Sequence, residues 1–396
     1  MRGAALLARQ LAALASGLLF VLVFPAPDLG WLAWIALVPL LIAIEGQTPA
    51  AGFRLGYLTG VVAFGGTLAW MRTFTPAAWL LVTAIAAIYL GAFAAGTRLL
   101  AQRYPQAVLW AAPLTWVAIE VVRSVGPIGF PWVLLGLSQY RTPQVLPLAG
   151  IVGVFGISGL IVLVNALAAS MIAARGLTRP AVAAVVLTLI AFGAAELRRA
   201  GTSGPERVVA ALQPNVPPVG RIDPAMARTA ISGLLQLTAE ARQAGAELIV
   251  YPESAVPADL AASPDLRASI ARSADGAIVV AGSLMSGPRN GLVVLDPEGK
   301  IIGRYAKRRL VPFGEAGIIP GRDPGIVTTP VGAIGLAICY ESAHPFMVRS
   351  VAAQGADIIA LLTNDGWFGT STGPPQHAAH AVIRAVETGR SLIRAA

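Results

Sequence analysis

Charged residues are scarce in this 396-residue chain: Asp, Glu, Lys and Arg together make up 12%, while 56% of the residues are hydrophobic. A water-soluble domain typically carries about 25% charged residues. The mean hydropathy of +0.70 is correspondingly high. The shortage lies in residues 1–200, which contain very few acids, whereas the remainder mixes Asp, Glu and Arg. We therefore predict a transmembrane helical domain over residues 1–200 and a globular domain over residues 206–396.

Other side chains are scarce as well. The chain has one cysteine, Cys339, which excludes an internal disulfide. Lys300 and Lys307 are the only lysines among 29 Lys and Arg residues. The sequence has no Walker loop, no dinucleotide glycine fingerprint and no interleaving of aromatic and basic residues. We expect no cofactor and no nucleic-acid partner, and we interpret the net charge of +9 as arginines that flank membrane spans.

The first 200 residues contain about seven apolar segments, some shorter than the ~20 residues of a typical span. They are residues 10–25, 31–45, 55–71, 77–97, 107–122, 148–173 and 181–197. The first could instead be a signal peptide. A cytoplasmic N-terminus places seven loop arginines inside (2, 9, 54, 98, 103, 175 and 179) and three outside (72, 123 and 141). The positive-inside rule favours this orientation, with residues after 200 outside the cytoplasm.

Two features of the apolar half stand out. Glu120 and Arg123 lie three residues apart near the end of one segment, as expected of a mutually neutralised pair near an interface. Residues 126–132 follow in the predicted outer loop and are rich in glycine, proline and aromatic residues. Trp132 could anchor the chain at the interface or line a lipid entry site.

From residue 206 the pattern predicts alternating strands and helices, hence an α/β layered domain. Strands are expected at residues 208–212, 247–251, 277–284, 291–295, 300–305, 333–338, 357–362 and 391–395, and helices at residues 224–244, 264–273, 345–354 and 375–388. Glu253 and Cys339 each follow an expected strand. The ends of strands are where such sheets keep their functional sites.

Cys339, Glu253 and Lys307 together offer a nucleophile, a carboxylate and an amine, which suffice for acyl transfer through a thioester. Lys307 stands out because a lysine ammonium can share a proton, whereas a guanidinium effectively cannot. Each residue also has a plain structural reading. A lone cysteine is commonly a small buried hydrophobe, Glu341 could cap a helix, and Glu315 could pair with an arginine.

Histidine offers an alternative. Cys339 could work with His377 and Asn364 as a thiol hydrolase, and His377 with His380 could hold a metal. The sequence supplies no second cysteine and no H-E-x-x-H pattern, so we expect no metal site.

The segments around these residues resemble the Glu-Lys-Cys enzymes of the nitrilase superfamily and, more narrowly, its membrane-embedded branch, the bacterial apolipoprotein N-acyltransferases. The matching segments are residues 120–123, 129–132, 251–254, 307–315, 339–341 and 364–369. The resemblance covers nearly the whole chain. Soluble nitrilases lack the seven spans and the Trp367-Phe368-Gly369 element.

The chain departs from the family pattern in three places. Residues 213–217 contain proline where the family usually has glycine, and a tryptophan usual a little further on is absent. Gly366 stands where the family often has alanine. The chain ends at Ala396 inside an expected strand, where the family continues to a final span. We therefore expect a chain shortened at its C-terminus.

The resemblance implies an α-β-β-α catalytic sandwich that moves an acyl chain from a membrane glycerophospholipid, through a thioester, to the N-terminal amine of a diacylated apolipoprotein. It implies Glu253 as general base, Cys339 as nucleophile, and Lys307 with the Tyr340 amide as oxyanion donors. Glu315 and Glu341 would position these groups.

The expected lining residues of a lipid-binding pocket are Phe130, Trp132, Asn364, Trp367 and Phe368. We expect a monomer in the bacterial inner membrane with its catalytic domain on the periplasmic side. The alternatives are a membrane-tethered amidase that uses the same three residues, a transporter with an accessory domain, and a silent scaffold.

Overall fold

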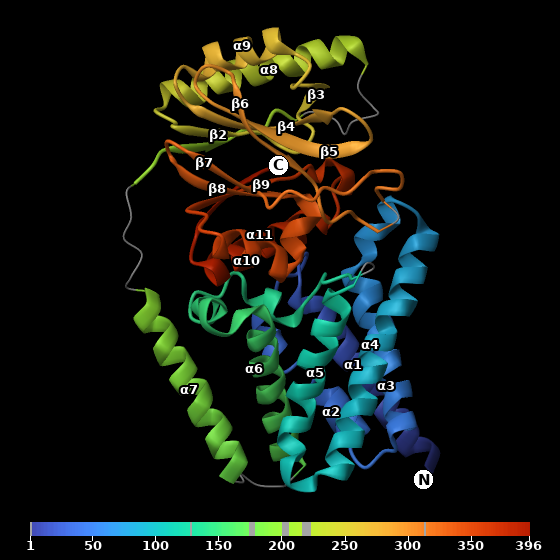
Figure 1. Ribbon diagram of the computed structural model, residues 1–396. Coiled ribbons are helices and arrows are strands. Elements are labelled where there is room, and N and C mark those ends of the chain that lie inside the picture. The colour runs from blue at the N-terminus through green and yellow to red at the C-terminus, as the bar shows by residue number, and fades with distance from the viewer. Residues whose placement is uncertain (1, 127–128, 174–178, 200–205, 216–222, 313) are drawn as a thin grey trace. The chain divides into compact units, whose positions relative to one another are not determined.

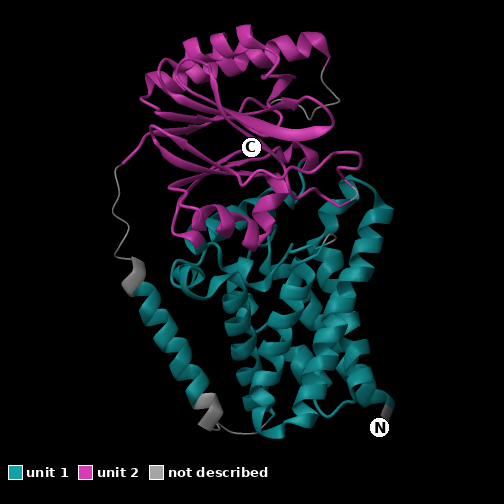
Figure 2. Ribbon diagram, viewed as in Figure 1, with its two compact units in different colours: residues 1–202, 370–387 teal, residues 203–369, 388–396 magenta. Residues whose placement is uncertain are grey.

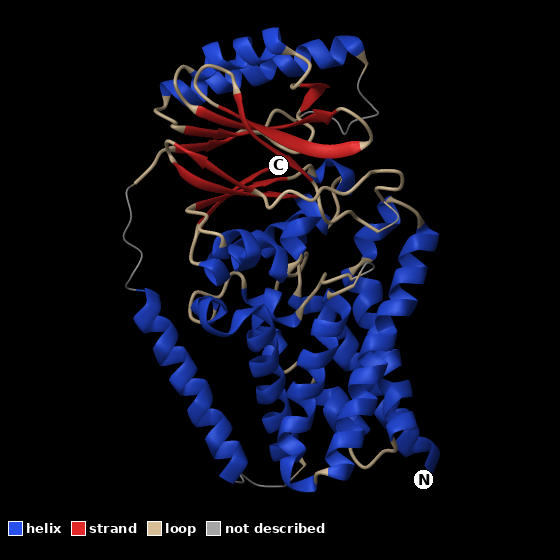
Figure 3. Cartoon of the chain, in the orientation of Figure 1, coloured by secondary structure: helices blue, strands red, loops and turns tan. Residues whose placement is uncertain are grey.

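The computed structural model describes residues 2–126, 129–173, 179–199, 206–215, 223–312 and 314–396. The chain forms two compact units (Figure 2). One comprises Met1–Thr202 and Thr370–Glu387, and we call it the helical unit; the other comprises Ser203–Gly369 and Thr388–Ala396, and we call it the sandwich unit. Every strand among these described residues lies in the sandwich unit (Figure 3).

The helical unit contains helices at all seven predicted apolar segments (Figure 1). They are α1 (Arg2–Val23), η1 (Gly30–Trp34) with α2 (Val38–Ile44), α3 (Pro49–Thr67), α4 (Pro76–Arg103), α5 (Val108–Ser124), α6 (Ala149–Ile172) and α7 (Arg179–Arg199). Short 3-10 helices lie between them: η2 (Ala69–Thr73), η3 (Pro105–Ala107), η4 (Leu135–Gln139) and η5 (Leu146–Leu148). Prolines in the first turn of α3 and α4 and threonine caps at Thr48 and Thr75 fix where these two helices begin.

Four stretches of described helix are long and apolar enough to cross a membrane: Gly3–Val23, Pro76–Arg103, Pro105–Ser124 and Leu146–Ile172. Two shorter apolar helices lie at Gly30–Ile44 and Ala183–Glu196. The helical unit is therefore a multi-pass membrane domain by length and composition. The count of seven spans and the orientation of the N-terminus remain predictions.

Glu120 and Arg123 form the expected ion pair, with 3.8 Å between Arg123 Nη2 and Glu120 Oε1, but both side chains are buried. Their shorter contacts are to backbone. Arg123 donates to the carbonyls of Trp132 (2.7 Å) and Val133 (2.9 Å), and Glu120 accepts from the Leu135 amide (2.7 Å). The predicted pairing of the two charges is confirmed, and its place near a membrane interface stays a prediction. The pair fixes the backbone that follows α5, and Arg123 is not an exposed loop charge.

Helix α11 (Gly373–Thr388) belongs mostly to the helical unit, although the sequence predicts a boundary near residue 200. Its buried Gln376 makes four hydrogen bonds. Oε1 accepts from the indole N–H groups of Trp70 (3.1 Å) and Trp132 (2.9 Å), and Nε2 donates to the carbonyls of Pro25 (3.0 Å) and Thr67 (2.9 Å). One amide therefore uses its full hydrogen-bonding capacity to join α11 to the ends of α1 and α3, η2 and the loop before η4.

The other end of α11 contacts a break in α6. Gly153 has non-helical dihedral angles (φ 67°, ψ 177°), which interrupts the hydrogen-bond ladder of α6 there. The amide of Val154 donates instead to Glu387 Oε1 at 2.6 Å, and Glu387 pairs with the buried Arg384 at 2.8 Å. Two buried polar contacts thus assign α11 to the helical unit.

Replacing Gln376 with leucine should destabilise the helical unit by about 2–5 kcal/mol, because two buried indole N–H groups lose their acceptor. The measurement is thermal unfolding in detergent. Gln102→Leu is the matched control, since Gln102 is exposed and makes one hydrogen bond, to the Gln47 carbonyl. Equal unfolding temperatures for the two variants would contradict this account.

The sandwich unit contains two sheets (Figure 1). The first has the order β1-β2-β4-β5-β6, with β3 beside β4, and the second has the order β10-β9-β8-β7. The strands are β1 (Val209–Ala211), β2 (Leu248–Val250), β3 (Val256–Asp259), β4 (Ile278–Met285), β5 (Arg289–Leu295), β6 (Ile301–Ala306), β7 (Ile326–Thr329), β8 (Gly332–Ile338), β9 (Ile358–Leu362) and β10 (Ser391–Ala395). In each sheet a parallel core continues into antiparallel strands.

Helices α8 (Pro224–Gln243) and α9 (Pro264–Ala274) cover the first sheet, and α10 (Pro345–Ala353) lies against the second (Figure 1). Leu234 of α8 and Ile270 of α9 belong to one buried apolar cluster with Ile249 and Val279 of the first sheet. Tyr251 belongs to the same cluster, and its hydroxyl forms a hydrogen bond of 2.6 Å with the hydroxyl of Thr238. The layered α-β-β-α sandwich is confirmed.

The predicted elements of the sandwich unit agree with the structure to within a few residues. Two strands were missed, β3 and β7, each of four residues. β3 contains Pro257, which removes a backbone donor and weakens the strand pattern. Val216 and Pro217 of the divergent segment 213–217, and Pro127 and Ile128 of the outer loop, lie outside the described residues.

Candidate active site

Cys339 comes directly after β8, as the sequence predicts, and begins the short 3-10 helix η6 (Cys339–Ala343). Its φ is +52°, a left-handed conformation that a residue with a Cβ rarely adopts. Such strain costs about 1–3 kcal/mol and persists only where the surrounding structure enforces it. The sharp turn from strand to 3-10 helix therefore fixes the thiol at the end of the strand.

Glu253 follows β2 by three residues, and its neighbour Ser254 also has a positive φ (+55°). The backbone of this turn lies directly on β4 at Gly282. A Cβ at residue 282 would come within 2.1 Å of the Pro252 carbonyl oxygen and 2.9 Å of the Glu253 Cα. Glycine is required there because only a residue without a side chain allows this approach.

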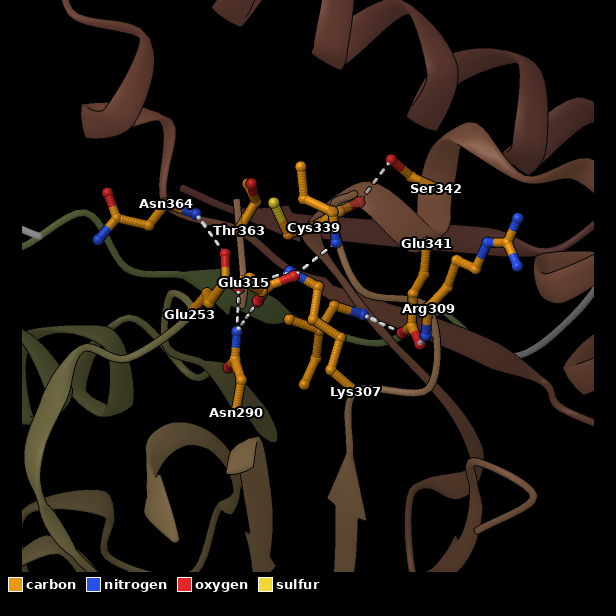
Figure 4. Close-up of polar contacts among 12 residues, drawn as sticks. Glu253, Asn290, Lys307, Arg309, Glu315, Cys339, Glu341, Ser342, Thr363 and Asn364 are labelled. Atoms are coloured by element: carbon orange, nitrogen blue, oxygen red, sulfur yellow. Dashed lines mark hydrogen bonds and ion pairs between the residues drawn. The ribbon is translucent and has the colours of Figure 1, made fainter. Parts of the chain in front are cut away.

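Lys307 follows β6, and its buried ammonium contacts two carboxylates. Its Nζ lies 3.1 Å from Glu253 Oε1 and 3.0 Å from Glu315 Oε1 (Figure 4). The other oxygens of these carboxylates accept from backbone: Glu253 Oε2 from the Asn364 amide (3.1 Å) and Glu315 Oε2 from the Val311 amide (2.8 Å). Both side chains are thus fixed at both oxygens.

Asn290, in β5, is a member of this cluster that sequence reasoning missed. Its Nδ2 donates to Glu253 Oε1 (2.7 Å) and to Glu315 Oε1 (2.9 Å), the same two atoms that Lys307 contacts (Figure 4). Asparagine is depleted in strands, so its position among the apolar residues of β5 was an available signal. Thr363 was also missed; it hydrogen-bonds to Cys339 and donates to Asp365 Oδ1 at 3.2 Å.

Glu341 is fully buried and connects the turn after β6 to the end of β8. Its Oε1 accepts from the amides of Arg308 (2.7 Å) and Arg309 (3.0 Å), and its Oε2 from the Ile338 amide (2.7 Å). The Tyr305 hydroxyl donates to both oxygens, at 2.8 and 2.9 Å. One carboxylate therefore holds the residue after Lys307 and the residue before Cys339, a positioning role.

Burial and the negative charge of Glu253 raise the pKa of the Cys339 thiol, Lys307 and the Thr363 hydrogen bond act in the opposite direction, and the net pKa is about 12. The sulfur is therefore protonated at neutral pH. A thiol is a poor nucleophile, so attack requires a base that takes the proton as the bond forms. Glu253 is a suitable base because it lies beside Cys339 and Lys307 in the same unit.

Burial acts to lower the pKa of Lys307, but the charge that Cys339 carries once it is ionised and the negative charges of Glu253 and Glu315 outweigh this, so the pKa is raised. The ammonium is charged throughout the physiological range. A permanently charged donor between two carboxylates and a thiol can stabilise negative charge that develops on a neighbouring oxygen.

The expected lining residues differ widely in their surroundings. Trp132 is buried, stacks on Phe130 (6.1 Å between ring centroids) and donates its indole N–H to Gln376; a lipid-lining role for it stays a prediction. Phe130 is partly buried in the same cluster. Asn364 uses its side chain to cap η7 (Asp365–Phe368) through the Gly366 amide.

The other two candidates lie in η7, directly after Asn364. Phe368 is buried, whereas Trp367 keeps 48% of its surface exposed. Within the sandwich unit, Trp367 is therefore the one expected lining residue whose ring is open to a ligand.

The alternative in which Cys339 works with His377 and Asn364 stays a prediction. His377 and His380 lie on α11 in the helical unit, where both rings pack against Trp132. Within the sandwich unit the charged groups that act on Cys339 are Glu253, Lys307 and Glu315. Among the described residues, no group of three or more His, Cys, Asp and Glu side chains could hold a metal ion.

The fold and the Glu-Lys-Cys cluster define a nitrilase-type α/β unit joined to a multi-pass helical unit. The family model for the N-terminal domain of apolipoprotein N-acyltransferase matches residues 16–167, and the carbon-nitrogen hydrolase model matches residues 209–396. An apolipoprotein N-acyltransferase of Geobacter metallireducens is 34% identical over 98% of this chain and 83% of that protein. That of Gloeobacter violaceus is 29% identical over 93% and 79%.

Among solved structures, a nitrilase-superfamily amidase of Nesterenkonia AN1 has 23% identity over 43% of this chain and 71% of its own, with a TM-score of 0.33. The sequence matches are the decisive ones, because they extend through both units. The chain belongs to the apolipoprotein N-acyltransferase family.

Proposed function

We propose that the chain transfers an acyl chain from a membrane glycerophospholipid to the N-terminal amine of the diacylglyceryl-cysteine of an apolipoprotein, through a thioester on Cys339. The observation that supports this most directly is the buried cluster of Glu253, Lys307 and Cys339 in a chain that also carries membrane-capable helices. The family membership supports a membrane-bound bacterial acyltransferase.

In the first half-reaction the Cys339 sulfur attacks the ester carbonyl while Glu253 takes the thiol proton. The C–S bond forms, the ester C–O bond breaks, and the proton passes from Glu253 to the departing alkoxide oxygen, which becomes the hydroxyl of the lysophospholipid. Lys307 and the Tyr340 amide stabilise the tetrahedral oxyanion, and each such donor contributes a factor of about 10²–10³ in rate.

In the second half-reaction the amine of the acceptor attacks the thioester, and Glu253 accepts a proton from the nitrogen. The C–N bond of the amide forms, the C–S bond breaks, and the proton passes from Glu253 to the departing sulfur, which regenerates the thiol. Two sequential transfers through one enzyme-bound acyl group predict ping-pong kinetics. The amine must compete with water, which an apolar, water-poor site favours.

We also propose an inner-membrane location with the sandwich unit on the periplasmic side. The distribution of loop arginines supports this orientation. The excess of arginines on the inner side becomes larger when the buried Arg123 is left out of the outer count. Both substrates are lipid-anchored, so a site at the outer headgroup level would reach both.

The decisive experiment incubates the chain in detergent with a phospholipid labelled in one acyl chain and without an acceptor. We expect a labelled, hydroxylamine-sensitive adduct on the peptide that contains Cys339, detected by mass spectrometry, and its discharge when a diacylated lipopeptide with a free amine is added. Cys339→Ser should give no hydroxylamine-sensitive adduct at neutral pH.

The opposite result is equally informative. If no lipid adduct forms but a small amide gives a transient thioester, the chain is a membrane-tethered amidase. The phospholipid donor and lipoprotein acceptor would then both be wrong.

A further inference from the structure

Asn290 and Lys307 lie directly across from each other on neighbouring strands. The amide of Lys307 donates to the carbonyl of Asn290 at 2.8 Å, which extends the pairing of Gly291 with Ala306 by one residue. Paired residues on adjacent strands project their side chains to the same face of the sheet. The backbone therefore presents the Asn290 amide group and the Lys307 ammonium to the same pair of carboxylates.

The contacts of the two residues are equivalent. Glu253 Oε1 accepts hydrogen bonds from Asn290 Nδ2 at 2.7 Å and from Lys307 Nζ at 3.1 Å. Glu315 Oε1 accepts from the same two nitrogens, at 2.9 Å and 3.0 Å respectively. Two carboxylate oxygens that share both donors lie close together and repel one another. Lys307 supplies one positive charge against two negative charges, so Asn290 supplies the additional donor without adding charge.

The orientation of the Asn290 amide is set by this arrangement. Exchanging its oxygen and nitrogen would place a carbonyl oxygen against two carboxylates. In the observed orientation Oδ1 is buried and has no hydrogen-bond partner among the described residues. An unsatisfied buried acceptor is a destabilising feature. Folding stability alone does not explain an asparagine here, whereas its two N–H···carboxylate contacts do.

We propose that Asn290 is a positioning residue for acylation: with Lys307 it holds the Oε1 atoms of Glu253 and Glu315 side by side and so fixes Glu253 near Cys339 (Figure 4). The inference rests on the acyl-transfer function proposed above. A neutral donor suits this task, because Glu253 must still accept the thiol proton, and a second cation in place of Asn290 would oppose protonation. The proton moves from sulfur to Glu253, and the net charge of the cluster does not change.

The pH dependence of Cys339 reactivity gives a direct readout. The titratable groups that face Glu253 are Lys307 after β6, Glu315 in the loop that follows, and Cys339 after β8. Cys339 is the only cysteine, so the rate of alkylation by iodoacetamide reports on this sulfur alone and needs no lipid. The acid limb of that rate reports the loss of a proton from the coupled Glu253 and Cys339 pair.

Removing a hydrogen-bond donor from a carboxylate raises its pKa, so Asn290→Ala should move the acid limb to higher pH by about one unit. Asn290→Asp has nearly the same shape and adds a third carboxylate, so its limb should move further. Labelled-phospholipid acylation of Cys339 should show the same order and fall at least about tenfold at its optimum for Asn290→Ala, because Glu253 is less well placed. Arg289→Gln is the control, since Arg289 is exposed beside Asn290.

The inference is overturned if the acid limbs of Asn290→Ala and Asn290→Asp both coincide with the acid limb of the unmodified chain and with that of Arg289→Gln. Thermal unfolding identifies a variant that does not fold, and the shape-conserving Asn290→Asp keeps the test available if Asn290→Ala fails. If the unmodified chain forms no acyl adduct, the proposed function is wrong, while the alkylation profiles still decide whether Asn290 acts on the Glu253 and Cys339 pair.

Discussion

Lys307→Met should reduce acylation of Cys339 about 10³-fold or more. The substitution removes a donor positioned for the oxyanion, which alone accounts for a factor of about 10²–10³. It also leaves Glu253 and Glu315, buried and close together, with no cation between them. The repulsion between these two carboxylates should then displace Glu253 from its position near the thiol, and a small displacement of a reacting group is costly. The measurement is the rate at which the labelled acyl group appears on Cys339.

The chain provides a matched control for this variant, because Lys300 is its only other lysine and lies in the turn between β5 and β6. Lys300→Met should keep acylation within about twofold of the unmodified chain, as expected for a surface substitution. Lys307→Arg separates charge from geometry. Its guanidinium is charged but larger and planar, and it should not restore activity. Acylation by Lys307→Met at a rate near that of Lys300→Met would remove Lys307 from the mechanism.

The elements of this protein could be predicted from the sequence because their signals are local. Apolar runs indicated seven helices, and alternating patterns located most of the strands within a few residues. Cys339 and Glu253 were placed correctly at strand ends because each follows a short apolar run. Lys307 was identifiable through its rarity.

What the sequence did not reveal depends on contacts between distant segments. The role of Asn290 follows from the register of β5 against β6, which sets its side chain beside Lys307. Trp132 was predicted to anchor the chain at the interface or to line a lipid entry site, and no local pattern indicates that its indole N–H donates to Gln376, 244 residues further along the chain. Local patterns contain no information about such pairs.

Glu341→Gln should disable the site without removing any group that contacts substrate. The carboxylate accepts from three backbone amides and from the Tyr305 hydroxyl. Glutamine offers one oxygen in place of two, and its NH₂ group would face amide N–H groups. One or two buried donors lose their acceptor, at about 1–3 kcal/mol each, so we expect the free energy of unfolding to fall by about 2–4 kcal/mol.

Activity should fall further than stability alone would require, by about 100-fold even at temperatures where the variant remains folded, because small displacements of reacting groups are costly. Glu341 connects the backbone beside Lys307 to the backbone before Cys339, so its loss shifts the donor and the nucleophile relative to each other. Glu298→Gln in an exposed turn should change neither property. Thermal unfolding and single-turnover acylation measure the two effects separately. A Glu341→Gln variant that unfolds earlier yet acylates Cys339 at the unmodified rate would reduce Glu341 to a residue of the core and leave the placement of Cys339 to the strained turn after β8.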